Sequence, residues 1–336
     1  MTAAPTPCFV CGAPSGARLV ESHRDRVSGL DYRLWSCAGC GVVYADPHDP
    51  VGADWYQKSM AGEMTVAPQR DGRYAAFFAD LPPEGPLLDI GCGRGDFLCL
   101  ARDRGYRGAS GIDYDPQRVA QARAAGLEAH AQDWESFCRS RPGGEFAVVT
   151  LFDVLEHVPD PVRLLAEVRR LLRPNGHIVI TLLNDSRPMP FGRELPDYPP
   201  HHFTRWSPAA LRGFLTRQRF VVEHQEARRL EVRYLLEMAT AHCAVEPALA
   251  LAKKLLFGGS ADPAASVTEN FASRQPAGGL AAALETKGLR RKLFSCYRSL
   301  AAAALTPPVL ALTWYYRCFR PDSGNNLYMR ARKDGV

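Results

Sequence analysis

From residue 86 onward, hydrophobic and polar positions switch repeatedly between a strand-like and a helix-like period. Short apolar runs predict strands at 86–90, 109–115, 127–133, 146–153 and 177–184. Amphipathic stretches between them predict helices, among them 95–105, 116–126 and 161–176. The last of these has Asp160 as its expected N-cap residue and Pro161 at its first position. This alternation predicts an α/β domain with a parallel sheet that is covered by helices on both faces.

Three more elements follow the alternating region. Residues 207–220 have the pattern of a capped helix, and residues 220–228 and 325–333 have the pattern of strands. The last strand needs a sheet to join, and the strand at 220–228 is its nearest available partner. We therefore interpret residues 231–322, whose helical stretches are amphipathic with Lys and Arg at their borders, as a helical insertion between two neighbouring strands.

The N-terminal segment carries four cysteines in two C-x2-C pairs separated by twenty-five residues. A glycine follows each pair, which allows the backbone to fold around a metal ion, and residues 32–37 between the pairs alternate like a strand. The pattern predicts a zinc ribbon in which four thiolates close the coordination shell, so the zinc is expected to be structural. The predicted ligands are Cys8, Cys11, Cys37 and Cys40.

Charge and composition add little about partners. The net charge of the 336-residue chain is +5, but residues 253–336 hold 13 Lys and Arg against 5 Asp and Glu, which suggests either an anion-facing surface or a solvated one. The N-terminus has no pattern of a secretory signal, so a reducing, cytoplasmic location is expected for the ten cysteines. The uncharged stretch 299–316 is interrupted by Pro307 and Pro308 and predicts two short buried or interfacial helices, candidates for peripheral membrane contact.

The segment "PLLDIGCGRGDFL" at 86–98 indicates the ligand of the sheet. A glycine turn after the first strand of such a sheet allows a nucleotide-like ligand to approach the backbone. The dinucleotide fingerprint would require another glycine where this chain has Asp96, and Asp89 before the turn suits a cationic amino group better than a phosphate. A nucleoside that carries an α-amino acid and no phosphate fits this pattern, and S-adenosylmethionine is such a molecule.

The segments "LLDIGCGRGDFL" and "GIDYDP" together resemble the class I S-adenosylmethionine-dependent methyltransferases. The resemblance covers roughly residues 86–230 and the final strand. It implies a doubly wound, Rossmann-like sheet of seven strands whose last strand is antiparallel, which explains the returning strand near the C-terminus.

The resemblance also implies a cofactor site. Gly91, Gly93 and Gly95 approach the methionine part of the cofactor, and Asp89 fixes its amino group through the loop. Asp113, at the end of the second strand, is expected to accept both ribose hydroxyls, because one carboxylate can hold two donors. The expected adenine contacts are Asp133, which could instead be a helix cap, and Trp134 beside the base.

The acceptor is expected beyond the fourth and fifth strands. There, "EHVPDP" resembles small-molecule methyltransferases, including those of quinone biosynthesis, and lacks the pattern of nucleic-acid base methylases. Glu156 and His157 could serve as a base, could join a third ligand in a metal site, or could only line the strand end and cap the next helix.

A second candidate acceptor segment is "YPPHHFTRWS" at 198–207. It resembles a loop of polysaccharide and deoxysugar methyltransferases, in which an acid and a histidine line the acceptor site. This makes His202, and after it His201, the candidate general base, with a purely structural loop as the alternative. Arg205 either binds an anionic acceptor or is solvated. Trp55 and Tyr56 either close the pocket or pack between domains.

The sequence thus predicts a zinc-containing enzyme that transfers a methyl group from S-adenosylmethionine to a small molecule, foremost a hydroxyl of a sugar or lipid-linked glycan. Two alternatives remain: an RNA methyltransferase that binds nucleic acid through the ribbon and the basic C-terminal region, and a non-catalytic scaffold that binds the cofactor. The acceptor atom and the oligomeric state have no signature in the sequence. The expected domains are a ribbon (1–45), a linker and helical lid (46–85), the cofactor-binding core (86–230), the insertion (231–322) and the final core strand (323–336).

Overall fold

The computed structural model describes most of the chain: residues 6–49, 55, 72–189, 193, 197–228, 232, 235–236, 239, 305–316, 318–320 and 322–335. Much of the expected linker and nearly all of residues 231–304 lie outside the described residues. The chain forms two compact units, which we describe separately. The first unit comprises Met1–Arg187, Pro196–Arg228 and Gly324–Val336, and the second comprises Pro188–Leu195 and Arg229–Ser323. The expected domain boundaries remain predictions.

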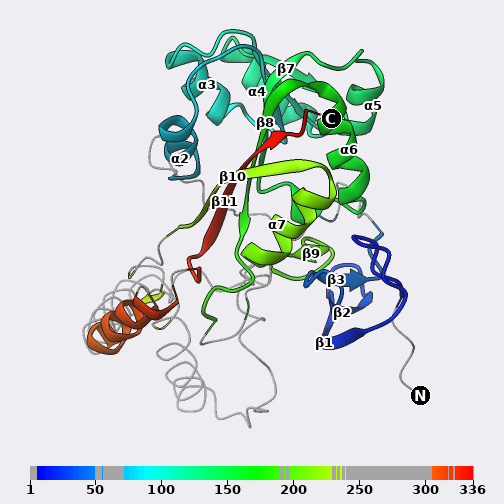
Figure 1. The fold of residues 1–336 in the computed structure, drawn as a ribbon, viewed down its shortest axis with the longest axis vertical. Helices are drawn as coiled ribbons and strands as arrows, with labels where there is room; N and C mark the ends of the chain where they lie inside the picture. The colour runs from blue at the N-terminus through cyan, green and yellow to red at the C-terminus, as the bar shows by residue number, and fades with distance from the viewer. Residues whose placement is uncertain are drawn as a thin grey trace, which may run out of the picture. The chain divides into compact units, whose positions relative to one another are not determined.

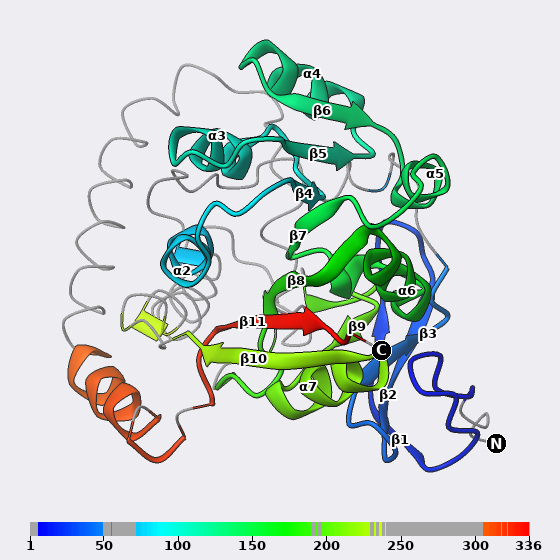
Figure 2. The same cartoon turned by 45° about the horizontal axis from the view of Figure 1, so that its top comes forward.

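A seven-stranded sheet forms the centre of the first unit, and its strands follow the order β10-β11-β8-β7-β4-β5-β6 (Figures 1 and 2). The five neighbours from β8 to β6 are parallel, whereas β11 runs antiparallel to both β8 and β10. The expected Rossmann-like methyltransferase fold with an antiparallel last strand is therefore confirmed. The strands are β4 (Leu87–Ile90), β5 (Ala109–Asp113), β6 (Glu128–Ala131), β7 (Phe146–Phe152), β8 (Leu172–Leu183), β10 (Phe220–Ala227) and β11 (Asn326–Lys333).

Several helices begin at a residue whose side chain caps the first turn. Asp115, Asp160 and Ser207 each precede a proline at the first helical position, and each side chain accepts a backbone N–H of the first turn. The cap expected at Asp160 is thus confirmed. The helices of this unit are α2 (Gly72–Asp80), α3 (Asp96–Asp103), α4 (Pro116–Ala124), α5 (Trp134–Arg139), the one-turn 3-10 helix η2 (Leu155–His157), α6 (Pro161–Leu171) and α7 (Pro208–Arg217).

The helix expected at 161–176 is shorter than predicted. α6 ends at Leu171, and Leu172 already has extended backbone angles and opens β8, where it pairs with Phe146. Pro174 cannot donate a helical hydrogen bond, and Asn175 has a positive φ of 61°, which an α-helix does not accommodate. The prediction of a longer helix was wrong because the helical spacing of hydrophobic residues continues past Leu171 into residues that form the start of β8.

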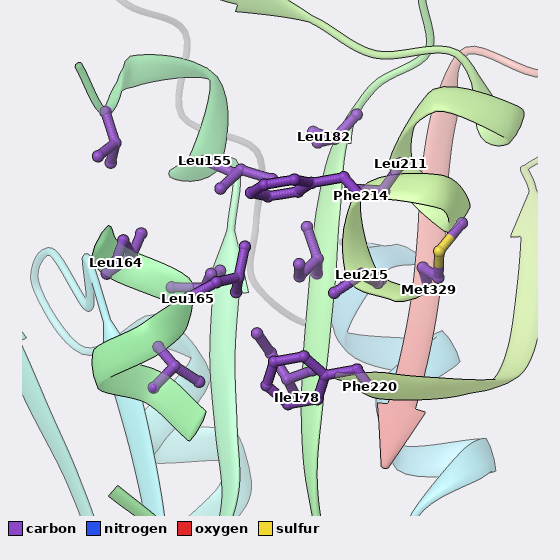
Figure 3. Packing of buried hydrophobic residues seen from close by; sticks show 14 of the residues in the cluster. Leu155, Leu164, Leu165, Ile178, Leu182, Leu211, Phe214, Leu215, Phe220 and Met329 are labelled. Atoms are coloured by element: carbon purple, nitrogen blue, oxygen red, sulfur yellow. The ribbon is translucent and has the colours of Figure 1, made fainter. Parts of the chain in front are cut away.

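Two apolar layers hold the sheet between its helices. On one face, α6 and α7 pack Leu164, Leu165 and Phe214 toward Ile178 of β8, as Figure 3 shows. On the other face, Phe77 of α2 and Phe97 of α3 are fully buried, with ring centroids 5.0 Å apart. Both faces are covered by buried apolar side chains, as the apolar runs of the parallel strands predict.

The N-terminal segment forms a second, four-stranded sheet in the order β1-β2-β3-β9. Its first three strands are β1 (Ala17–Arg24), β2 (Asp31–Cys37) and β3 (Val43–Asp46), whereas β9 (Thr204–Arg205) comes from the loop before α7. We call β1, β2, β3 and the two cysteine turns the N-terminal module. Since β3 pairs with β9, the module is joined to the loop that carries the two adjacent histidines.

Within the second unit, residues 305–316 are helical, and Pro307 and Pro308 lie within this helical stretch. Leu235, Ala239 and Val309 form a small buried cluster. None of the helices in the described part of the chain is long and apolar enough to cross a membrane.

Candidate functional site

The glycine turn after β4 has the conformation that its sequence predicts. Gly91, Gly93 and Gly95 all have positive φ angles, of 80°, 54° and 85°. A Cβ at residue 91 would lie 2.6 Å from Val154 Cγ2, and one at residue 95 would lie 2.3 Å from Leu127 Cδ1. Both the backbone angles and the close neighbours therefore require glycine at positions 91 and 95.

Asp113 connects the glycine turn to the end of β5. Its Oδ2 accepts the backbone N–H of Gly93 at 2.9 Å, and its Oδ1 accepts that of Asp115 at 2.9 Å. The side chain is held beside the turn by these two bonds, and each oxygen retains a second lone pair for a ligand. The arrangement is compatible with the predicted ribose contact, which remains a prediction.

Asp89 lies beneath the turn and is only 3% exposed. Its Oδ1 accepts the hydroxyl of Thr150 at 2.7 Å. Burial raises the pKa of Asp89 to about 7, and the nearby negative charge of Asp113 acts in the same direction. A cation that binds near Asp89 would favour its ionised form.

Asp133 and Trp134 begin α5. The Asp133 carboxylate accepts the backbone N–H of Ser136 at 2.7 Å, and this bond lowers the pKa of Asp133. Asp133 is therefore a helix cap, which was the alternative interpretation of this residue. Its expected contact with adenine stays a prediction. The Trp134 ring lies 5.8 Å from the guanidinium carbon of Arg163.

An ion pair at the end of β7 was not predicted from the sequence. Asp153 has a positive φ of 55° and forms an ion pair with Arg73 of α2. Its second oxygen accepts the hydroxyl of Thr181 at 3.0 Å. A strained carboxylate at this position is typical of a functional site, and the only sequence signal was an acidic residue at the end of a buried strand.

Glu156 is fully buried within η2. Neither of its carboxylate oxygens has a hydrogen-bond partner among the described residues. Burial and the nearby charge of Asp153 raise its pKa well above the ordinary value. Among the alternatives left open for Glu156, capping of the next helix is excluded, because Asp160 caps α6.

Three histidines from two segments form a compact cluster, which we call the histidine cluster: His157, His201 and His202. The ring centroid of His157 lies 4.3 Å from that of His201 and 4.7 Å from that of His202, and the last two rings stack at 4.7 Å. Burial lowers the pKa of His201 to about 3 and that of His202 well below its ordinary value. His201 and His202 are therefore neutral imidazoles at neutral pH.

The backbone of the histidine loop is a turn, so the two adjacent side chains can share one side. The backbone N–H groups of His201 and His202 both donate to the carbonyl of Tyr198 at 3.1 Å. Phe203 N then donates to the carbonyl of Glu156 at 2.8 Å, and its own carbonyl accepts Ala45 N of the module at 2.9 Å. In an extended segment two adjacent side chains would face opposite sides. The turn removes that constraint.

Arg205 is buried, so the expectation of a solvated arginine is wrong. It forms an ion pair with Glu21 of β1, its Nε donates to the carbonyl of Asp197 at 3.1 Å, and it lies 5.0 Å from the centroid of the Tyr198 ring. The sequence could not show this because Glu21 is 184 residues away. The residue links the module to the histidine loop.

The four cysteines of the module come together as a possible metal site. The Sγ atoms of Cys8 and Cys40 are 3.8 Å apart, and those of Cys11 and Cys37 are 3.6 Å apart. Zinc–sulfur bonds of about 2.3 Å in a tetrahedron place sulfurs about 3.8 Å apart, whereas a disulfide requires about 2.05 Å. The donor set fits a structural zinc ion.

Trp55 lies close to the cluster. Its Nε1 donates to Asp25 of the module at 3.0 Å, and its ring stacks on His201 with centroids 6.2 Å apart. Tyr56 lies outside the described residues. The contact with His201 is compatible with the pocket-closing role considered for Trp55, which remains a prediction.

Comparison with known proteins identifies the family of this site. A family described as "Methyltransferase domain" matches residues 60–255, more than half of the chain. The ubiquinone biosynthesis O-methyltransferase of Xanthomonas oryzae pv. oryzae is 32% identical over 176 residues, which cover 51% of this chain and 64% of that protein. The enzyme of the same name from Sodalis glossinidius is 36% identical over 106 residues, which cover 29% of this chain and 41% of that protein. The chain thus spans less than two thirds of the length of each relative.

The similar solved structures match this chain at low sequence identity and low TM-score. A SAM dependent methyltransferase from Archaeoglobus fulgidus is 17% identical with a TM-score of 0.46, and the match covers 83% of this chain and 98% of that one. The strand order, the glycine turn and the matched family agree, and this chain belongs to the methyltransferase-domain family.

Proposed function

We propose that the protein transfers a methyl group from S-adenosylmethionine to a hydroxyl of a small molecule, with the histidine cluster at the acceptor side. The observation that carries the proposal is the cluster itself. His157 follows β7, the neighbour of the strand that carries the glycine turn, and its ring lies 4.7 Å from that of His202, which is buried and has a pKa well below its ordinary value. In open α/β sheets, ligands bind beyond the carboxyl ends of such strands. The relatives' printed name, O-methyltransferase, supports an oxygen acceptor.

The residues divide the work between binding and proton removal. Asp113 and the glycine turn hold the nucleoside, and Asp89 favours the amino group of the methionine part. S-adenosylmethionine supplies an electrophilic methyl carbon on a sulfonium. His202 takes the proton of the acceptor hydroxyl while the oxygen–carbon bond forms and the carbon–sulfur bond breaks, and the thioether product leaves. A sugar or lipid-linked glycan remains our finer proposal for the acceptor.

The class of acceptor can be tested with labelled cofactor. Purified protein would be incubated with methyl-labelled S-adenosylmethionine and an extract of host cells, and the label followed into nuclease-sensitive, organic-soluble and small polar fractions. Label in the organic or polar fraction supports the proposal and identifies the fraction to purify. Label in the nuclease-sensitive fraction would contradict it and favour an RNA acceptor.

Replacement of Asp113 by asparagine is expected to weaken S-adenosylmethionine binding about 10- to 100-fold, because charge-assisted hydrogen bonds contribute about 1.5–3 kcal/mol each. Isothermal titration calorimetry measures the effect. Asp103→Asn is the matched control, since Asp103 lies exposed at the end of α3. An Asp113→Asn protein that binds within twofold of the parent would refute the ribose assignment.

Replacement of Asp89 by asparagine is expected to stabilise the cofactor-free protein and to weaken cofactor binding about tenfold. The pKa of Asp89 is raised in the folded protein, so the folded state holds its proton more tightly than the unfolded state does. Ionisation of Asp89 therefore lowers the free energy of unfolding, by an amount that grows as pH rises from 3.8 to about 7 and is constant above. The full decrease is at most about 4 kcal/mol. Urea unfolding at pH 8 should show the gain, and at pH 4 the gain should nearly vanish. An equal gain at both values would contradict this account.

A further inference from the structure

We infer that the histidine cluster binds one divalent transition-metal ion, with a coordination position left open toward the acceptor. The inference deepens the proposed function and rests on it in one respect, namely that the acceptor hydroxyl reaches the cluster. It concerns a second metal site, distinct in ligands and in chemistry from the four cysteines of the module.

The geometry of the cluster is close to that of a metal site. One ligand nitrogen from each of His157, His201 and His202 lies within 4.8 Å of the other two. Tetrahedral coordination with metal–nitrogen bonds of about 2.0–2.1 Å needs nitrogens about 3.3 Å apart. The nitrogen–nitrogen distances must therefore shorten by on the order of an ångström. Rotation of the side chains achieves this without movement of the backbone.

The structure also orients one ligand in advance. His157 Nδ1 lies 2.7 Å from the carbonyl oxygen of His201. A carbonyl only accepts, so Nδ1 carries the proton, and the lone pair of the neutral ring is on Nε2. A second-shell carbonyl of this kind fixes the tautomer and the ring plane of metal-binding histidines.

The two segments that carry the ligands are held together by the backbone. Phe203 N donates to the carbonyl of Glu156 at 2.8 Å, so η2 and the histidine loop are joined on either side of the cluster. The pairing of β3 with β9 fixes the same loop from the module. A set of ligands on two joined segments loses little conformational entropy when it closes on an ion.

A buried carboxyl group with no hydrogen-bond partner among the described residues belongs to Glu156, next to His157 in the chain. Glu156 precedes His157, is 3% exposed, and has no hydrogen bond to either carboxylate oxygen from the described residues. Native structures rarely leave such a group unpaired unless a ligand, water or ion completes it. This observation is independent of the histidine geometry. The charged groups that act on the Glu156 carboxyl are Asp153 and Arg73, so it points to a polar ligand beside that ion pair, at the end of β7.

The donor set selects the class of metal and its chemistry. Three imidazoles suit zinc and its neighbours in the transition series, and three protein ligands with one open position characterise catalytic rather than structural zinc. A hydroxyl bound at that position has a lowered pKa. It then loses its proton to solvent, its oxygen bonds to the methyl carbon, and the carbon–sulfur bond breaks. With the ion bound, all three histidines are ligands, and the ion supplies the acidification otherwise assigned to His202.

Metal content of the purified full-length chain tests the inference. After zinc supplementation and gel filtration, we expect two zinc ions per chain in the parent, one in the double variant His157→Ala/His202→Ala, and two in the control His177→Ala, whose imidazole pairs with Glu223 away from the cluster. One zinc per chain in the parent would overturn the inference and leave His202 as a free base.

A spectroscopic titration keeps the test valid if the double variant does not fold. Cobalt(II) added to parent protein that holds zinc only in the cysteine site, after a mild chelator has removed the second ion, should produce visible ligand-field bands without thiolate charge-transfer bands, because the second site has only nitrogen and oxygen donors. Absence of such bands would overturn the inference. Neither readout needs an acceptor. Two metal ions per chain without methylation of any hydroxyl compound would therefore contradict the proposed function alone.

Discussion

Replacement of His202 by alanine is expected to lower kcat about 10²- to 10⁴-fold, the usual contribution of a positioned group that removes a proton. S-adenosylmethionine should bind the variant within twofold of the parent, because the glycine turn and Asp113 belong to other loops. The neutral, buried imidazole is the form that accepts a proton or binds a metal ion, so either role leads to the same loss. Single-turnover kinetics with saturating cofactor measure the effect.

The matched control is His177→Ala, which removes an imidazole from the same sheet at a site paired with Glu223. It should keep kcat within about twofold. A His202→Ala enzyme with parental turnover would eliminate the cluster as the acceptor site and direct attention to the Asp153–Arg73 ion pair. A variant that loses cofactor binding as well would show that His202 supports the fold rather than the reaction.

Local patterns predicted the parts of the molecule that depend on neighbours along the chain. The glycine turn, the cap at Asp160 and the pairing of β11 with β10 follow from residues close in sequence or from the need of the last strand for a partner, whereas the antiparallel direction of β11 was implied by the family resemblance. The end of α6 did not follow, because a helical pattern continued into residues that pair with β7.

The acceptor side was predicted in part, for a physical reason. His157, His201 and His202 were each candidates, but their assembly depends on a turn at Tyr198 and on a strand pair with the module, which have no periodic signature. The burial of Arg205 against Glu21 and the pairing of Asp153 with Arg73 join residues far apart in the chain. Such contacts are fixed by tertiary packing alone, so single-sequence patterns do not reveal them.

Loss of the module's metal is expected to have an effect as large as loss of His202. We propose that Cys8, Cys11, Cys37 and Cys40 hold one zinc ion, and structural zinc contributes about 10–16 kcal/mol of binding free energy in isolated zinc fingers at pH 7. Cys37→Ser removes one thiolate at the end of β2. The module should then lose its zinc and its order, and the pairing of β3 with β9 should be lost with it.

The consequence should be selective, because β9 anchors the histidine loop whereas the glycine turn lies on the main sheet. We expect Cys37→Ser to release zinc and to lose at least about 10²-fold in kcat, the lower end of the range for a positioned proton-removing group. Cofactor affinity should change only a few-fold.

Cys318→Ser, at an exposed cysteine of the second unit, is the matched control and should leave zinc content, kcat and cofactor affinity unchanged. If Cys37→Ser instead abolished cofactor binding and turnover together, the module would be part of the folding core. If turnover persisted after the zinc had gone, the β3–β9 pairing would not be what holds the histidines in place.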